Sequence, residues 1–169
     1  MDYLSLTIEE LHKCLVNKEI TPLELTKLAI EKAKKDTNNA FETICEKEAL
    51  EFASTLKDVE EDNVFWGIPY VAKDNFSTKN ILTTASSNIL KDYVPVFDAT
   101  VIEKLKNAKA VLIGKTTLDE LAMGGTGTTG HLGKTFNPYD ETHQYMIGGS
   151  SCGSAAAMAS AIVPFALGS

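Results

Sequence analysis

The chain has 169 residues, and 44% of them are hydrophobic, which is too many for a disordered chain and ordinary for a folded domain. Its net charge of −7 arises within residues 1–62, which hold 15 acidic and 8 basic residues. All 16 basic residues are lysines, so no arginine fork is available to bind phosphate. This balance argues against direct, non-specific binding of nucleic acid, which requires a basic surface.

The three cysteines, Cys14, Cys45 and Cys152, are odd in number and widely spaced. They fit neither a disulfide framework nor a zinc site. No secretory signal is visible at the start of the chain, and the apolar run at 155–167 is too short to cross a bilayer. We therefore expect a cytoplasmic protein without a membrane segment and without a bound metal.

Helices are predicted in the first third of the chain. Thr7 is a candidate N-cap, because acidic residues and then an apolar stripe follow it. Thr21 begins a second helix, with Pro22 at the first helical position and Glu24 completing a capping box. A short strand at 40–45 and a third amphipathic helix at 46–58 follow.

The composition changes at an acidic linker, 58–63, and we divide the chain there. Residues 1–62 are predicted to form an N-terminal helical segment that packs on the core. Residues 63–169 are predicted to form the first portion of an α/β domain.

Strands and helices alternate in this second segment. A buried strand ends at Lys73, a helix capped by Asp98 leads into a strand at 110–114, and a loop then enters a short helix at Thr117. Such alternation predicts a mostly parallel sheet covered by helices. After a long loop rich in glycine and threonine, a helix of small residues leads into a last apolar strand.

Two stretches of this region, "VLIGKT" and "GTGTTGHLGKT", look like phosphate-binding loops but lack the required spacing of glycine, four residues and Gly-Lys-Ser/Thr. The second stretch lies within the long loop at 123–149, and a loop of this length commonly lines a site.

Two candidates for chemistry remain open from the residues alone. Lys73 is either a surface lysine at a strand end or, among its apolar neighbours, a proton acceptor, because burial disfavours the charged form. Ser150 and Ser151 follow two glycines, and either cap the next helix or direct a hydroxyl toward a substrate. A Ser-His-Asp arrangement would need His131 or His143, which nothing places near Ser150, so lysine is the better partner.

The stretches "GIPYVAKDNF" and "GGSSCGSAAA", which hold Lys73 and Ser150, resemble the motifs of the amidase signature family. The stretches "FDATVIEKLKNAKAVLIGKTTLDELAMG" and "LTIEELHKCLVNKEITPLELTKLAIEKA" resemble its glutamyl-tRNA(Gln) amidotransferase branch, in the A-type chain. The resemblance covers nearly the whole chain. It implies the amidase-signature α/β fold, incomplete in these residues, with added N-terminal helices.

The resemblance also implies a serine–cis-serine–lysine triad. Lys73 matches the base, and Ser150 matches the middle serine, which follows a cis Gly149–Ser150 peptide bond. The family's nucleophile lies about 24 residues after the middle serine, in a second Gly-Gly-Ser, which falls beyond Ser169. We therefore expect the 169-residue chain to be inactive by itself.

A substrate-facing loop of the family matches residues 123–127, so Met123, Gly124 and Gly125 are candidate substrate-loop residues, with Ser151 as their neighbour. The chain departs from the family pattern twice. It is richer in glycine within this loop, and Cys152 replaces a glycine, which tests whether that position needs a positive φ.

For the whole protein, the resemblance implies hydrolysis of glutamine. The ammonia would be used by partner subunits B and C to convert Glu-tRNA(Gln) to Gln-tRNA(Gln), with the tRNA held through the first of these partners. ATP and Mg²⁺ would be used by the same partner, and no cofactor is expected in this chain. Two alternatives remain, a general aliphatic or aryl amidase of the same family and a non-catalytic scaffold.

Overall fold

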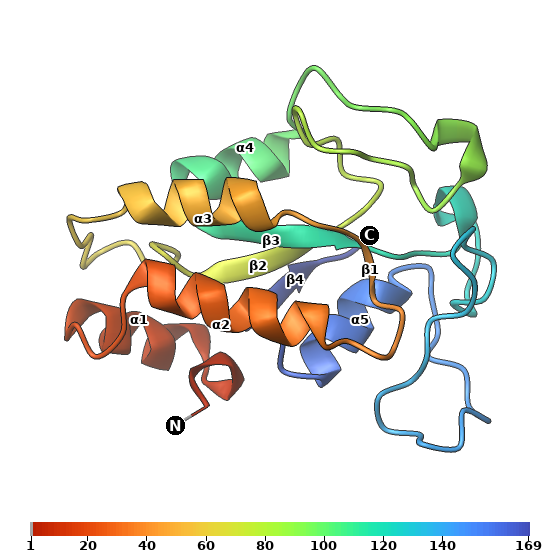
Figure 1. Cartoon of the computed structure of the whole chain (residues 1–169), viewed down its shortest axis with the longest axis horizontal. Helices are drawn as coiled ribbons and strands as arrows, with labels where there is room; N and C mark the ends of the chain where they lie inside the picture. The colour runs from red at the N-terminus through yellow and green to blue at the C-terminus, as the bar shows by residue number, and fades with distance from the viewer. Residues whose placement is uncertain (1) are drawn as a thin grey trace.

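The computed structural model describes residues 2–169 as a four-stranded sheet with helices on both faces (Figure 1). The strands are β1 (Phe41–Ile44), β2 (Pro69–Lys73), β3 (Val111–Thr116) and β4 (Phe165–Leu167). Their order is β1-β3-β2-β4, with β2 parallel to both β3 and β4, and β1 antiparallel to β3. The predicted α/β fold with a mixed, mostly parallel sheet is confirmed.

Five α-helices and three short 3₁₀ turns belong to the described residues. The helices are α1 (Ile8–Val16), α2 (Pro22–Lys34), α3 (Glu46–Thr55), α4 (Thr100–Asn107) and α5 (Cys152–Ala159), and the turns are η1 (Tyr3–Ser5), η2 (Asn88–Leu90) and η3 (Glu120–Ala122). Both predicted N-caps are confirmed. Thr7 and Thr21 each form a complete capping box with the glutamate three residues later.

Side chains of β2 alternate between two apolar clusters. Val71 packs into the larger cluster, which α1, α2, α3 and α5 share, whereas Tyr70 and Ala72 pack against α4 through Ile102 and Leu105. Figure 1 shows α4 on one side of the sheet, with α2 and α5 on the other. Every residue of β2 is buried, as expected for a parallel strand covered on both faces.

The predicted cap of α4 is wrong. The N-cap residue is Ala99, and no side chain caps this helix. Asp98 instead accepts a hydrogen bond of 2.7 Å from the Lys79 N–H and lies 3.6 Å from the Lys106 ammonium. Its carboxylate therefore joins α4 to the loop after β2 rather than capping its own helix.

The short helix predicted at Thr117 does not form. Three residues later the chain makes the single turn η3, in which Leu121 and Ala122 have φ values of 51° and 61°, outside the right-handed helical region. Thr117 stays outside any helix because its N–H donates to the Ala40 carbonyl and its hydroxyl donates to the Asn39 carbonyl. These bonds join it to the residues before β1, so tertiary contacts override the local helix signal.

The two predicted segments share one sheet, because β1 from residues 1–62 pairs with β3. The boundary at residue 62 remains a prediction. None of the helices within residues 2–169 has the length and apolar character needed to cross a membrane.

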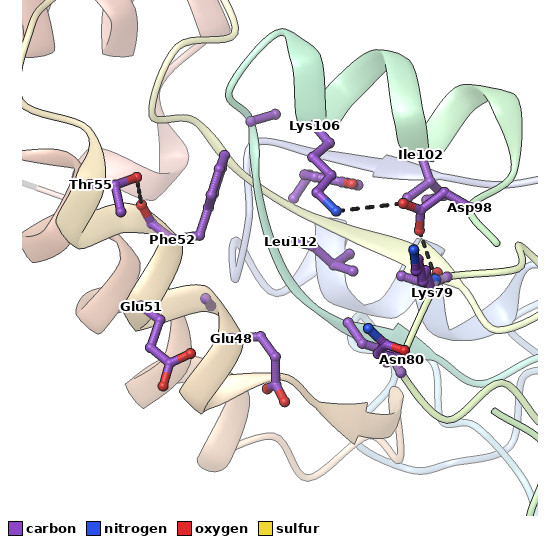
Figure 2. A pocket seen from close by; sticks show the side chains of 15 residues that line it. Glu48, Glu51, Phe52, Thr55, Lys79, Asn80, Asp98, Ile102, Lys106 and Leu112 are labelled. Carbon is purple, nitrogen blue, oxygen red and sulfur yellow. Dashed lines mark hydrogen bonds and ion pairs between the residues drawn. The ribbon is translucent and has the colours of Figure 1, made fainter. Parts of the chain in front are cut away.

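A cavity of about 460 Å³ lies between α3 and α4 (Figure 2). Phe52 of α3, Ile102 of α4 and Leu112 of β3 contribute apolar surface, and Glu48 and Lys106 contribute charge. Neither Lys73 nor Ser150 lines this cavity, so the catalytic candidates lie elsewhere.

Candidate active site

The carboxyl ends of three parallel strands meet at one edge of the sheet. Lys73 ends β2, Thr116 ends β3, and Leu167 ends β4. Ser154 of α5 links two of these ends, with its hydroxyl 2.8 Å from the Thr116 hydroxyl and donating to the Leu167 carbonyl at 2.8 Å. This edge is where open α/β sheets bind ligands.

Lys73 is fully buried at this edge. Its ammonium donates to Ser150 Oγ at 2.7 Å, to Ser169 Oγ at 2.9 Å and to the Ser169 carbonyl at 3.3 Å. No aspartate or glutamate side chain of residues 2–169 forms an ion pair with it. Burial lowers the pKa of Lys73, and the Cys152 sulfur and the Asp119 carboxylate only partly oppose that effect.

Ser150 follows a cis peptide bond from Gly149, as the family resemblance implied. Its carbonyl accepts a 3.1 Å hydrogen bond from the Asp119 N–H, which ties the serine loop to the loop after β3. A Cβ on Gly149 would collide with Oδ2 of Asp119. Glycine is therefore required at position 149 by a close approach between two loops.

The interpretation of this loop as a simple helix cap is wrong. Ser151 is the N-cap residue of α5, but its side chain makes no capping hydrogen bond. Its hydroxyl instead donates to the Ser169 carbonyl and accepts from the Ser169 N–H, both at 3.1 Å. Ser151 therefore holds the segment after β4 beside Lys73.

The predicted substrate loop lies next to Ser150. The Gly125 main chain lies against Gly149, Gly124 lies against Asp119, and Met123 is 81% exposed. Cys152 is buried and its φ is not positive, so the cysteine at this position is compatible with the backbone.

The histidines do not join the cluster. His131 lies 3.6 Å from Glu42, and the His143 ring packs 4.4 Å from the Phe136 ring. His12 forms a 2.8 Å hydrogen bond with the Glu61 carbonyl. A Ser-His-Asp arrangement at Ser150 is therefore not formed by these residues.

A buried ion pair supports the chain just after Lys73. Lys115 and Asp74 are both fully buried and lie 3.1 Å apart, and Lys115 also donates to Thr83 Oγ1 at 2.9 Å. Asp74 accepts from the N–H and hydroxyl of Thr84 at 2.6 and 2.7 Å. The pair ties the loop after β2 to β3 and so orients the end of β2.

Three residues near Lys73 were missed by the sequence interpretation. Asn75 donates to Ser169 Oγ at 3.2 Å, Ser169 contacts Lys73 directly, and Asp119 contacts the Ser150 main chain. The position of Asn75 two residues after Lys73 was a usable signal. Ser169 and Asp119 had none, because their contacts are formed between segments far apart in the sequence.

The family model named Amidase matches residues 24–169, and the chain belongs to this family. It is 49% identical over 172 residues to the A-type subunit of glutamyl-tRNA(Gln) amidotransferase from Oenococcus oeni, an alignment that covers 99% of this chain and 35% of that protein. The chain thus spans about a third of the length of the curated relatives it matches.

Solved structures agree with this assignment. A crystal structure of the same type of amidotransferase subunit from Thermotoga maritima is 38% identical with a TM-score of 0.75, over 99% of this chain and 34% of that one. A crystal structure described as an amidase is 32% identical with a TM-score of 0.84, over 96% of this chain and 38% of that one.

Proposed function

We propose that these residues form the N-terminal part of a glutamine-hydrolysing amidotransferase subunit. The observation that carries the proposal is the 2.7 Å contact between Lys73 Nζ and Ser150 Oγ, in an amidase-family chain that is 49% identical to the A-type subunit of an amidotransferase. We call the protein that continues this chain through the rest of the family domain the full-length subunit.

In the proposed mechanism Lys73 acts as a neutral amine. It accepts the Ser150 hydroxyl proton while Ser150 takes the proton of the nucleophilic serine beyond residue 169. The nucleophile then attacks the side-chain carboxamide carbon of glutamine to form a tetrahedral intermediate. Collapse of this intermediate breaks the C–N bond, and the proton returns through Ser150 to the leaving ammonia. Water hydrolyses the acyl-enzyme to glutamate.

The loop at 123–127 is proposed to face the substrate. Its support is the contact of the Gly125 main chain with Gly149, which brings the loop to the cis peptide. Met123, Gly124 and Gly125 would shape this side of the glutamine site, and Ser151 would hold the segment after β4 in place.

The partners proposed for the full-length subunit are subunits B and C of an amidotransferase. The released ammonia would amidate Glu-tRNA(Gln) on the first of these partners, using ATP and Mg²⁺ bound there, in the cytoplasm where translation takes place. The acidic, arginine-free composition supports this division, because tRNA binding would fall to the partner.

The test is substitution of Ser150 by alanine in the full-length subunit with its partners. Loss of a positioned proton donor and acceptor lowers the rate about 10²- to 10⁴-fold, measured as glutamine hydrolysis. Ser54→Ala is the matched control, because the Ser54 hydroxyl bonds only the Glu51 carbonyl of its own helix. Equal activity of the two variants would contradict the proposal.

A general amidase is the second candidate. It is favoured by the higher TM-score to the amidase structure, 0.84, than to the amidotransferase structure from Thermotoga maritima, 0.75. Purification with subunits B and C, together with a preference for glutamine over simple aliphatic and aryl amides, supports the amidotransferase. The opposite preference without partners supports the amidase.

A further inference from the structure

Asp119 is a fully buried carboxylate that forms no ion pair with any lysine of residues 2–169. Its Oδ2 accepts from the N–H groups of Thr126 at 3.1 Å and Gly127 at 3.0 Å. Its Oδ1 accepts from the N–H groups of Thr128 at 3.1 Å and Thr129 at 3.3 Å, and from the Thr129 hydroxyl at 3.0 Å. Five donors from one loop therefore surround a single buried charge.

This loop solvates the charge in place of water. Burial alone would raise the pKa of Asp119, but the hydrogen bonds from Gly127, Thr129 and Thr128 together hold it below its ordinary value. The carboxylate therefore stays ionised at neutral pH. Four consecutive N–H groups can converge only when residues 126–129 wind around it, so the charge determines the shape of this loop.

The same residue also contacts the serine loop. Its N–H donates to the Ser150 carbonyl, and its side chain leaves no space for a Cβ on Gly149 or Gly124. A Cβ on Gly124 would lie 2.6 Å from Asp119 Cγ. Asp119 thus lies between the Met123–Thr129 loop and Ser150, which contacts Lys73.

Asp119 acts on Lys73 through charge as well. Its carboxylate opposes the effect of burial and raises the pKa of Lys73, and the Cys152 sulfur of α5 acts in the same direction. The other groups in contact with the ammonium are the uncharged hydroxyls of Ser150 and Ser169 and the Ser169 carbonyl.

We propose that Asp119 is a positioning residue that holds the Met123–Thr129 loop and Ser150 in the arrangement that places Ser150 Oγ against Lys73. Its consequence for hydrolysis rests on the function proposed above. Asp119 does not contact the reacting atoms. It acts on two groups that are proposed to do so, the substrate loop and the Lys73–Ser150 pair.

The test compares Asp119→Asn with Asp140→Asn in the full-length subunit. Asp140 is a matched control, because its carboxylate also accepts N–H and hydroxyl donors within its own loop, from Thr142 and Tyr145, and not from the serine loop. In Asp119→Asn an amide NH₂ group replaces one carboxylate oxygen. This NH₂ group cannot accept the hydrogen bonds of the two N–H groups that the oxygen had accepted. Hydrogen exchange measured by mass spectrometry should therefore accelerate at 126–129 in Asp119→Asn, and only near 142–145 in Asp140→Asn.

The kinetic readout separates positioning from loss of folded protein. We expect kcat for glutamine to fall about 10- to 100-fold in Asp119→Asn, with a smaller change in KM, because Ser150 is displaced from Lys73. The acidic limb of the pH profile should also move to lower pH, since loss of the negative charge lowers the pKa of Lys73. A merely structural role would reduce the active fraction without moving that limb.

The rate at which a sulfonyl fluoride inactivates the full-length subunit, measured as a function of pH, reports the same acidic limb without the use of glutamine. If glutamine is not hydrolysed but exchange and inactivation respond as expected, the proposed substrate is wrong and the role of Asp119 stands. If Asp119→Asn behaves like Asp140→Asn in exchange and in the pH profile, the role of Asp119 is overturned. Should Asp119→Asn not fold, Thr129→Val removes the hydroxyl that donates to Asp119 and accepts from the Glu120 N–H, and keeps the other four donors. It must give a smaller change in the same direction, and no change would overturn the inference.

Discussion

Lys73 and Lys115 are two fully buried lysines on neighbouring strands, and the groups around them differ. Burial lowers the pKa of both. Lys115 contacts the Asp74 carboxylate, which opposes that effect, whereas Lys73 contacts hydroxyl groups. An ammonium among hydroxyls gives up its proton more readily than one paired with a carboxylate, so Lys73 is suited to proton transfer and Lys115 to structure.

The pH profile of the full-length subunit tests this distinction. Because burial lowers the pKa of Lys73, its neutral form is present at lower pH than for an ordinary lysine. Glutamine hydrolysis should therefore rise with pH along an acidic limb whose midpoint lies below the pKa of free lysine, and reach a plateau above it. A limb centred at the free-lysine value, measured as kcat/KM against pH, would contradict the assignment.

Replacement of each lysine by methionine in the full-length subunit should affect stability differently. Lys115→Met leaves the Asp74 charge buried and unpaired, which costs about 3–5 kcal/mol of unfolding free energy. Lys73→Met removes a desolvated charge and leaves no carboxylate unpaired, so the unfolding free energy should be unchanged or higher. Urea denaturation of both variants at neutral pH measures this, and equal losses would show that the two lysines are equivalent.

At the scale of elements, a long loop joins η3 to α5 and contains little regular secondary structure. Within residues 123–151, one isolated bridge joins Phe136 to Met146, and Figure 1 shows the loop extending from one end of the sheet. Its ends are nevertheless held closely together, because Asp119 fills the space between Gly124 and Gly149. Further along, it is held by the Asn39 side chain, which donates to the carbonyls of residues 132–134, and by the Phe136 N–H, which donates to the Asn38 carbonyl.

A pair of glycine substitutions tests this anchor. Gly149→Ala places a methyl group against the Asp119 carboxylate and should cost about 1–3 kcal/mol of unfolding free energy, as overpacking does. Gly125→Ala meets no atom within 4 Å and should leave the melting temperature unchanged. Thermal unfolding of both variants measures the difference, and similar melting temperatures would refute a tight contact at position 149.

At the scale of the whole molecule, apolar surface is left uncovered. Strand β4 is at the edge of the sheet, where it pairs only with β2 among the described strands. Ile89, Val96 and Phe97 are 77%, 82% and 55% exposed. A strand edge and apolar side chains in contact with water favour association between chains.

We therefore expect the 169-residue chain, made by itself, to self-associate. We also expect it to lack glutamine hydrolysis, since the nucleophile implied by the family resemblance lies beyond residue 169. Sedimentation at increasing concentration measures association, and ammonia release measures activity. A monomer with a sharp cooperative melt would contradict the first expectation. Glutamine turnover that is lost on Ser150→Ala would contradict the second.

Local interactions explain what the sequence predicted well. Thr7 and Thr21 cap helices through bonds to residues three positions away, and the buried strand β2 follows from four apolar residues in a row before Lys73. Where a distant partner competes, local signals failed, as at Asp98 and Thr117. The parallel sheet followed from the order of strands and helices, which requires no knowledge of individual contacts.

By itself, the sequence predicted most of the helices and strands and the class of fold, and it made Lys73 and Ser150 candidates that the family resemblance then assigned to the triad. Only the tertiary structure decided that Lys73 Nζ lies 2.7 Å from Ser150 Oγ, and that Ser169 and Asp119 join them. The physical reason is separation along the chain. These contacts depend on which strand ends and loops meet in space. The residues next to Asp119 in the sequence give no signal that it contacts the serine loop.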